Sequence, residues 1–117
     1  MVREMILVLP RPLSVNNLFV NIPGRGRVPS GTYQRWKKAA DDMLWQQKRA
    51  MKKFIGPVHV TLTIEDKGRI DADNCGKCCL DFLVRHEIID DDRREIVRKL
   101  TIQFGDVQGC EAEVIAA

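Results

Sequence analysis

The segment from residue 58 to 65 constrains the fold most strongly, because apolar and polar side chains alternate along its whole length. An alternation with a period of two places its two sets of side chains on opposite sides of an extended chain. The valines, isoleucine and threonines in the segment also favour a strand, and Gly56-Pro57 marks a turn just before it. We therefore expect a half-buried β-strand, which needs a sheet and a covering layer.

Between residues 33 and 51 the spacing becomes helical. Lysines and arginines mostly separate the residues of the stripe, and Ser30 stands where a helix N-cap is expected. The pattern predicts one long amphipathic helix. Its inward stripe comprises Tyr33, Trp36, Ala40, Met43, Leu44, Gln47 and Met51.

Two N-terminal segments have different characters. Residues 5–9 form a continuous apolar run that ends at Pro10, which is typical of a buried strand. Residues 12–29 are rich in Pro, Ser, Asn and Gly, a composition that predicts an exposed loop.

The C-terminal half predicts three further elements. A second helix is expected from about Asp73 to His86, and strands are expected within residues 96–104 and 110–115. The order β-α-β-α-β-β predicts an α/β or α+β fold in which a mixed sheet packs with two main helices.

The length of 117 residues fits one domain, residues 1–117. No apolar run approaches the roughly 20 residues that a membrane helix needs. The first ten residues lack the small-residue cleavage site of a signal peptide, so we expect a cytoplasmic protein without a membrane partner.

Cysteine spacing leaves two interpretations. Cys75, Cys78 and Cys79 crowd into five residues without a secretory signal, which favours buried, reduced thiols. The Cys75-x-x-Cys78 spacing also suits zinc, with Cys110 as a further ligand, although structural zinc sites usually show a second ligand pair. A zinc-stabilised interaction module therefore stays open as an alternative.

Charge is unevenly distributed along the chain. Residues 1–70 carry 13 Lys and Arg against 5 acids, and the remainder carries 6 against 11. A basic body beside an acidic cluster suits a protein that attracts a polyanion and brings it to divalent cations. A solvated surface of mixed charge would show the same counts.

The acidic residues gather around two points. Asp71 and Asp73 stand two residues apart before the second predicted helix, and residues 90–92 are all Asp. Carboxylate oxygens without His or Cys ligands favour Mg²⁺ or Mn²⁺ over Zn²⁺. Such a metal can activate water and neutralise charge on a phosphodiester.

Lys77 follows Asp73 by four residues, which predicts the same helix face and an ammonium group beside the carboxylate. The ordinary alternative is that Asp73 or Asn74 caps the helix, Asp73 and Lys77 form an exposed ion pair, and residues 90–92 form an acidic turn.

The ordered set of these residues resembles a known family. Asp71-x-Asp73-Asn74-x-x-Lys77-x-x-x-Asp81-x-Leu83, followed by an apolar pair and Asp91-Asp92, is similar to the signature of the RusA family of Holliday junction resolvases. Leu9-Pro10-x-Pro12-x-Ser14-x-Asn16-Asn17 resembles the family's Pro-rich segment after the first strand. The resemblance covers nearly the whole chain.

The resemblance implies a homodimeric, Mg²⁺-dependent nuclease that places symmetric nicks in a four-way DNA junction. It makes Asp71, Asp73 and Asp92 the catalytic metal-site carboxylates, with Asp91 sharing the site and Lys77 as base or electrostatic partner. Because Asp90 adds a third acid, which two of residues 90–92 form the pair stays open, and the apolar Ile88-Ile89 before them favours the last two.

Basic and amide side chains are the expected DNA contacts: Arg69, Lys67, Asn16, Asn17, Arg25 and Arg27. Arg69 stands two residues before Asp71, on the same side of an extended chain, where it can meet a phosphate at the metal. An endonuclease for flaps or forks and a non-enzymatic DNA-binding protein are the alternatives.

Overall fold

A computed structural model describes residues 4–47 and 53–117. Its main sheet has the strand order β1-β6-β4-β5, with antiparallel pairing from β1 through β6 to β4 and parallel pairing between β4 and β5. The strands are β1 (Glu4–Leu9), β4 (Val58–Glu65), β5 (Val97–Gly105) and β6 (Cys110–Ala116). The predicted α+β fold with a mixed sheet and two main helices is confirmed.

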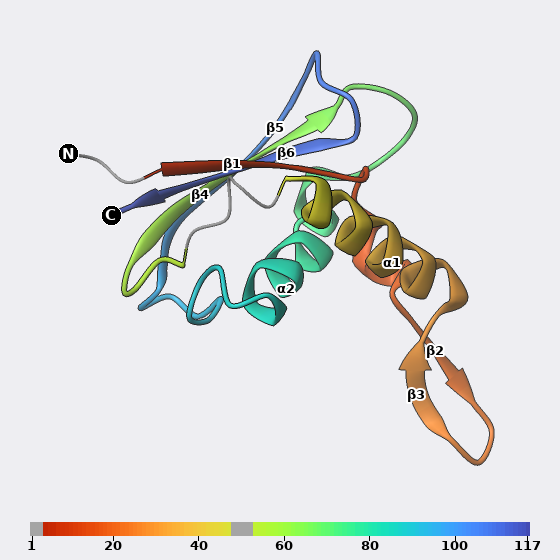
Figure 1. Cartoon of the computed structure of the whole chain (residues 1–117). Helices are drawn as coiled ribbons and strands as arrows, with labels where there is room; N and C mark the ends of the chain where they lie inside the picture. Colours follow the sequence, from red (N-terminus) through yellow and green to blue (C-terminus); the bar gives the residue numbers. More distant parts are fainter. Residues whose placement is uncertain (1–3, 48–52) are drawn as a thin grey trace.

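Two helices, α1 (Gly31–Gln46) and α2 (Lys77–Arg85), lie on one face of the sheet (Figure 1). Ser30 caps α1 as predicted, because its hydroxyl accepts a hydrogen bond from the Tyr33 amide at 3.0 Å. The inward stripe of α1 is buried at Tyr33, Trp36, Ala40 and Leu44. Met51 of the predicted stripe lies outside the described residues.

The strand from residue 58 to 65 alternates as predicted, with the four apolar side chains from Val58 to Ile64 fully buried. The prediction for the first strand was wrong in one respect. Its residues alternate in burial, and Ile6 and Val8 are exposed. The helices cover only one face of the sheet, so a continuous apolar run at its edge is buried on one side alone.

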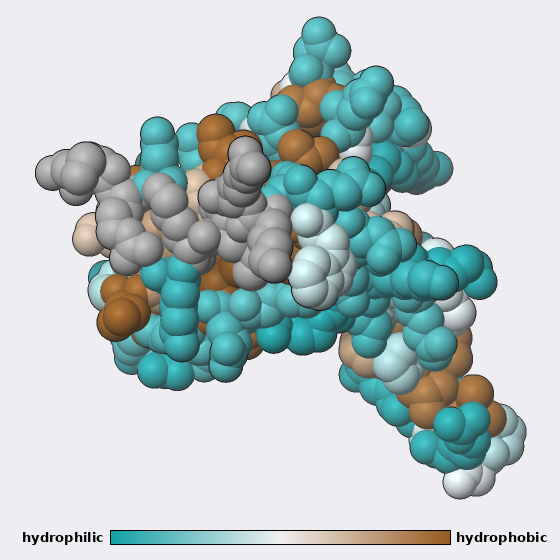
Figure 2. All heavy atoms as spheres, viewed as in Figure 1, coloured by the Kyte–Doolittle hydropathy of each residue, from teal (hydrophilic) through white to brown (hydrophobic). Residues whose placement is uncertain are grey.

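A hairpin replaces the predicted loop between residues 12 and 29. A 3-10 turn (Val15–Asn17) leads into β2 (Phe19–Ile22), which pairs with β3 (Gly26–Pro29). The hairpin extends away from the body of the molecule (Figures 1 and 2). Its strands have only four residues each, too few for a hydrophobic period to stand out among turn residues.

The second helix begins later than predicted. Residues 72–74 form a separate 3-10 turn, and Gly76 is the N-cap of α2. Asp and Asn compete for backbone hydrogen bonds and Gly has low helix propensity, which explains the break. Asp73 and Lys77 therefore do not share a helix, and neither Asp73 nor Asn74 caps α2.

The C-terminal end of α2 agrees with the prediction, because His86 is its C-cap. Glu87 follows in a left-handed conformation with φ of 58°. The Ile88 amide donates to the Leu83 carbonyl and the Glu87 amide to the Val84 carbonyl, at 2.9 and 3.0 Å. This pair of bonds is a Schellman motif, which turns the chain towards the acidic segment.

The four cysteines are free and buried, as the reduced-thiol interpretation predicts. Neighbouring Cys110 and Cys78 raise the pKa of the Cys79 thiol well above its usual value, together with burial. Cys79 is therefore a neutral member of the core. None of the helices among the described residues has the length and apolar character to cross a membrane.

Candidate metal and nucleic-acid site

A pocket of about 420 Å³ opens beside the two helices. It draws side chains from α1, from α2 and from the acidic segment after α2, which are distant in the sequence. The lining residues are Tyr33, Lys37, Lys77, Asp81, Val84, Arg85, Asp91 and Asp92.

Lys77 connects two sides of this pocket. It is the first residue of α2, and its Nζ lies 3.1 Å from Asp81 Oδ1 and 3.9 Å from Asp92 Oδ2. About half of the Lys77 side chain is exposed, so these ion pairs contribute little to stability. These ion pairs instead position the Lys77 ammonium group beside Asp92.

The Asp91 carboxylate is fixed by hydrogen bonds from the two residues that follow it. It accepts from the Asp92 backbone amide and from Arg93, both at 2.8 Å. The amide hydrogen bond, followed by Arg93, lowers the pKa of Asp91 below its ordinary value. The carboxylate is therefore ionised at neutral pH.

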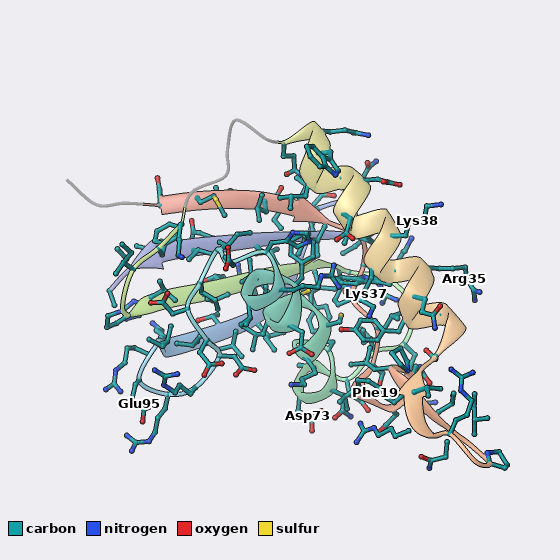
Figure 3. The ribbon with its side chains drawn as sticks, turned by 60° about the horizontal axis from the view of Figure 1, so that its bottom comes forward. Phe19, Arg35, Lys37, Lys38, Asp73 and Glu95 are labelled. Atoms are coloured by element: carbon teal, nitrogen blue, oxygen red, sulfur yellow. The ribbon has the colours of Figure 1, made fainter. Side chains whose placement is uncertain are left out.

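Asp71 and Asp73 lie outside the lining of this pocket. Both are exposed on the turn that precedes α2, and Asp73 lies at the N-terminal end of that helix (Figure 3). Asp71 is extended, with φ of −90° and ψ of 129°. Lys77, which lines the pocket, follows this turn in the sequence.

Mg²⁺ fits the chemistry of these donors, since it prefers carboxylate oxygens and commonly takes one or two of them plus a substrate phosphate. Within the described ranges, however, no group of three His, Cys, Asp or Glu side chains is spaced to hold a metal ion. Asp91 and Asp92 line one pocket, and the other two carboxylates remain on the adjacent turn.

The predicted DNA contacts fall on two surfaces. Arg69 is exposed on the loop before Asp71. Lys67 on the same loop pairs with Glu65 at 3.3 Å, and its carbonyl accepts from Arg11. These bonds fix the backbone close to Arg69.

The other predicted contacts belong to the hairpin. Asn16 and Arg27 line a second hollow of about 350 Å³, and the Arg27 guanidinium lies 4.4 Å from the Phe19 ring centroid. Asn17 uses its carbonyl to accept from Ser30. Arg25 is exposed at the hairpin turn, where its amide donates to Ile22.

Sequence reasoning named Lys37 as a candidate phosphate contact but assigned no functional role to Tyr33, Val84 or Arg85 of the first pocket. Lys37 points towards α2, whereas Arg35 and Lys38 point away from it (Figure 3). The Lys37 Nζ lies 4.7 Å from the Tyr33 ring centroid. Burial, followed by the charge of Asp81, raises the pKa of Tyr33. The four-residue spacings of Tyr33–Lys37 and Lys77–Asp81 were the available signal.

Arg85 also lines the pocket. It forms an ion pair with Asp41 of α1 at 2.5 Å, and His86 lies 2.8 Å from the same oxygen. These contacts connect the C-terminal end of α2 to α1 beside the pocket.

No family model and no curated protein matches the chain. The resemblance to the RusA family accordingly rests on the motif residues themselves.

Proposed function

We propose that the chain is a cytoplasmic, Mg²⁺-dependent endonuclease that resolves four-way DNA junctions by paired nicks, in recombination and repair. The observation that supports this most is the position of Lys77, which follows the turn bearing Asp73 by a few residues and lies 3.9 Å from Asp92 in the pocket. In the proposed site, all five residues would act at the N-terminal end of α2. The products would carry a 5′ phosphate and a 3′ hydroxyl.

The proposed roles follow from the donor types. Asp71, Asp73 and Asp92, with Asp91, would hold the Mg²⁺. The bound metal would supply an activated water and neutralise charge on the phosphoryl oxygens. Lys77 would stabilise negative charge that develops on the scissile phosphate, because it lines the same pocket as Asp91 and Asp92.

The basic residues around this end of the molecule support a DNA substrate. Arg69 precedes the metal-site turn, Lys37 faces α2, and Arg25 and Arg27 lie on the extended hairpin. Together they would contact phosphates on several arms of a branched substrate. Symmetric cuts in such a substrate need two active sites and hence a homodimer.

The test is cleavage of a synthetic mobile four-way junction with Mg²⁺, with a linear duplex, a flap and a fork of related sequence in parallel. We expect wild type to nick the junction symmetrically. Asp73→Asn should bind it with similar affinity but cleave at least about 100-fold more slowly, because it removes a charged metal ligand. Asp66→Asn, an exposed acid outside the site, is the matched control and should cleave normally.

A second candidate is a non-enzymatic DNA-binding protein. The separation of the two pairs of carboxylates among the described residues favours it. Metal-independent junction binding by wild type, without cleavage in Mg²⁺ or Mn²⁺, would select this candidate and reject the nuclease. Preferential cleavage of the flap or fork would instead change the substrate within the nuclease class.

A further inference from the structure

The hairpin carries a hollow of about 350 Å³ on one of its faces. Asn21 aligns with Arg27 across the hairpin, and Phe19, two residues before Asn21, lies on the same face. This volume falls in the range of pockets that bind small organic groups, about 300–1,000 Å³. The other residues that line the hollow are Val15, Asn16 and Val20.

Two side-chain amides of the hollow are available to a ligand. Asn16 and Asn21 are both exposed, and among the described residues their hydrogen bonds involve the backbone alone. Each amide group offers two donors and an acceptor oxygen. Proteins use this combination to read the edge of a nucleobase.

Arg27 and Phe19 add a flat, charged surface beside the amides. The Arg27 guanidinium lies over the Phe19 ring, 4.4 Å from its centroid. Because Arg27 is exposed, the outer face of the guanidinium and its N–H edges remain accessible. A guanidinium plane stacks on nucleobases, and its N–H groups donate to phosphate oxygens.

The hollow adjoins the pocket that contains Lys77. The Phe19 ring meets the Tyr33 ring at 5.8 Å between centroids, and Tyr33 lines that pocket. Phe19 lies at the end of the hairpin that joins the body (Figure 3), where the Ser30 amide donates to the Leu18 carbonyl at 2.9 Å. One DNA strand advances about 3.4 Å per nucleotide, so a strand in the pocket would reach the hollow within a few nucleotides.

We propose that the hairpin hollow binds an unpaired DNA base at the branch point. Asn16 and Asn21 hydrogen-bond to the edge of the base, and Arg27 stacks on its face while its N–H edge meets a phosphate. A base is removed from the helix at least cost where it is already unpaired. The proposal rests on the proposed function for its DNA substrate, and it makes the hairpin a reader of bases as well as a backbone contact.

Binding in the absence of metal tests this proposal with two four-way junctions. Each junction has one extra unpaired nucleotide at the branch point, which bears a base in one junction and is abasic in the other. The two have the same number of phosphates, so the ratio of their affinities reports contacts to the base. We expect the full-length protein to bind the base-bearing junction about tenfold more tightly in fluorescence anisotropy.

Variants of exposed residues locate the contact. Asn16→Ala combined with Asn21→Ala should reduce the ratio to about twofold or less, because the edge of the base loses its partners. Gln34→Ala is the matched control and should keep the ratio: Gln34 is an exposed amide that donates to the Pro29 carbonyl at 3.3 Å, and it lies outside the hollow. Arg25→Gln should weaken binding of both junctions equally, because a phosphate contact does not distinguish them. Circular dichroism would establish that the variants fold.

Each other outcome overturns the proposal. Equal affinity of the wild type for the two junctions would reject the base site. A ratio that the double variant leaves unchanged would place the base contacts outside the hollow, and an equal loss in Gln34→Ala would assign the effect to the fold of the hairpin. Absence of binding to either junction would reject DNA as the occupant.

The proposal and the proposed function can fail separately, because the measurement contains no metal and involves no cleavage. Discrimination between the two junctions by a protein that does not cut DNA in Mg²⁺ would reject the nuclease and keep the base site. Cleavage of junctions by a protein that binds both equally would keep the nuclease and reject the base site.

Discussion

Glu87 is the described non-glycine residue with a positive φ, 58°, and it occupies the position after the C-cap of α2. Glycine is the usual residue there, because a Cβ atom in the left-handed region costs about 1–2 kcal/mol. The backbone bonds of the Schellman motif hold Glu87 in this conformation. The turn that directs the chain to Asp91 and Asp92 therefore depends on a residue that is unfavourable in the left-handed conformation.

Replacing Glu87 with Gly should stabilise the protein. The relief of the left-handed conformation exceeds the extra entropy of Gly in the unfolded chain, so we expect a gain of about 1 kcal/mol in the free energy of unfolding. Urea denaturation measures it. Glu87→Ala is the control: it removes the charge but keeps the Cβ atom, and an equal gain in that variant would show that charge, not backbone conformation, is the cause.

Individual residues also show which local features could be predicted from the sequence and which could not. Local rules were sufficient for Ser30 as the cap of α1 and for the buried cysteines. They were insufficient for Lys77, whose partner at 3.1 Å is Asp81 and not Asp73. The break at Cys75 and Gly76 decides this, and the low helix propensity of Gly76 favours such a break without requiring it.

At the scale of elements, the strands with a clear period and the helix with a clear cap were predictable, because one local pattern determines each of them. The hairpin from Phe19 to Pro29 was not, since its pairing depends on turn geometry more than on hydrophobic alternation. The one-sided burial of β1 was also missed. It depends on where the helix layer ends, which is a property of packing.

Gln47 gives an element-scale prediction, because its side chain joins the end of α1 to the edge of β1. Gln47→Ala should lower the free energy of unfolding by about 1–2 kcal/mol through loss of the two hydrogen bonds to Val8. Gln46→Ala, at an exposed neighbouring position, should change it by less than about 0.5 kcal/mol. Equal effects in chemical denaturation would indicate that helix propensity, and not the strand edge, determines the loss.

At the scale of the whole molecule, basic and acidic residues that are separated in the sequence also lie in different parts of the structure. The basic hairpin extends from the body, and the acidic residues from 71 to 92 lie around α2 (Figures 1 and 3). The counts of charged residues fitted a polyanionic partner as well as a solvated surface of mixed charge, and they could not show that two arginines lie on the extended hairpin.

This arrangement predicts the salt dependence of DNA binding. If Arg25 and Arg27 each contact a phosphate, replacing both with Gln should reduce the slope of log affinity against log salt concentration by about 1.8. Fluorescence anisotropy from 50 to 200 mM salt, roughly the range over which such effects are large, measures the slope. Lys99→Gln is the control, since Lys99 aligns with exposed His59 on the sheet face away from the helices. An unchanged slope in the double variant would remove the hairpin from the DNA interface.

The parallel pairing of β4 with β5 has a consequence for biosynthesis. The connection between these two strands, residues 66–96, contains every proposed metal ligand and Lys77. Moreover β6, which follows the other described strands in the sequence, lies between β1 and β4. The sheet therefore cannot assemble until β6 has been synthesised, and the long-range pairing of β6 with β1 is slow. The proposed cutting centre would therefore form only after β6 has been made, so a chain that stops before β6 would not cut DNA.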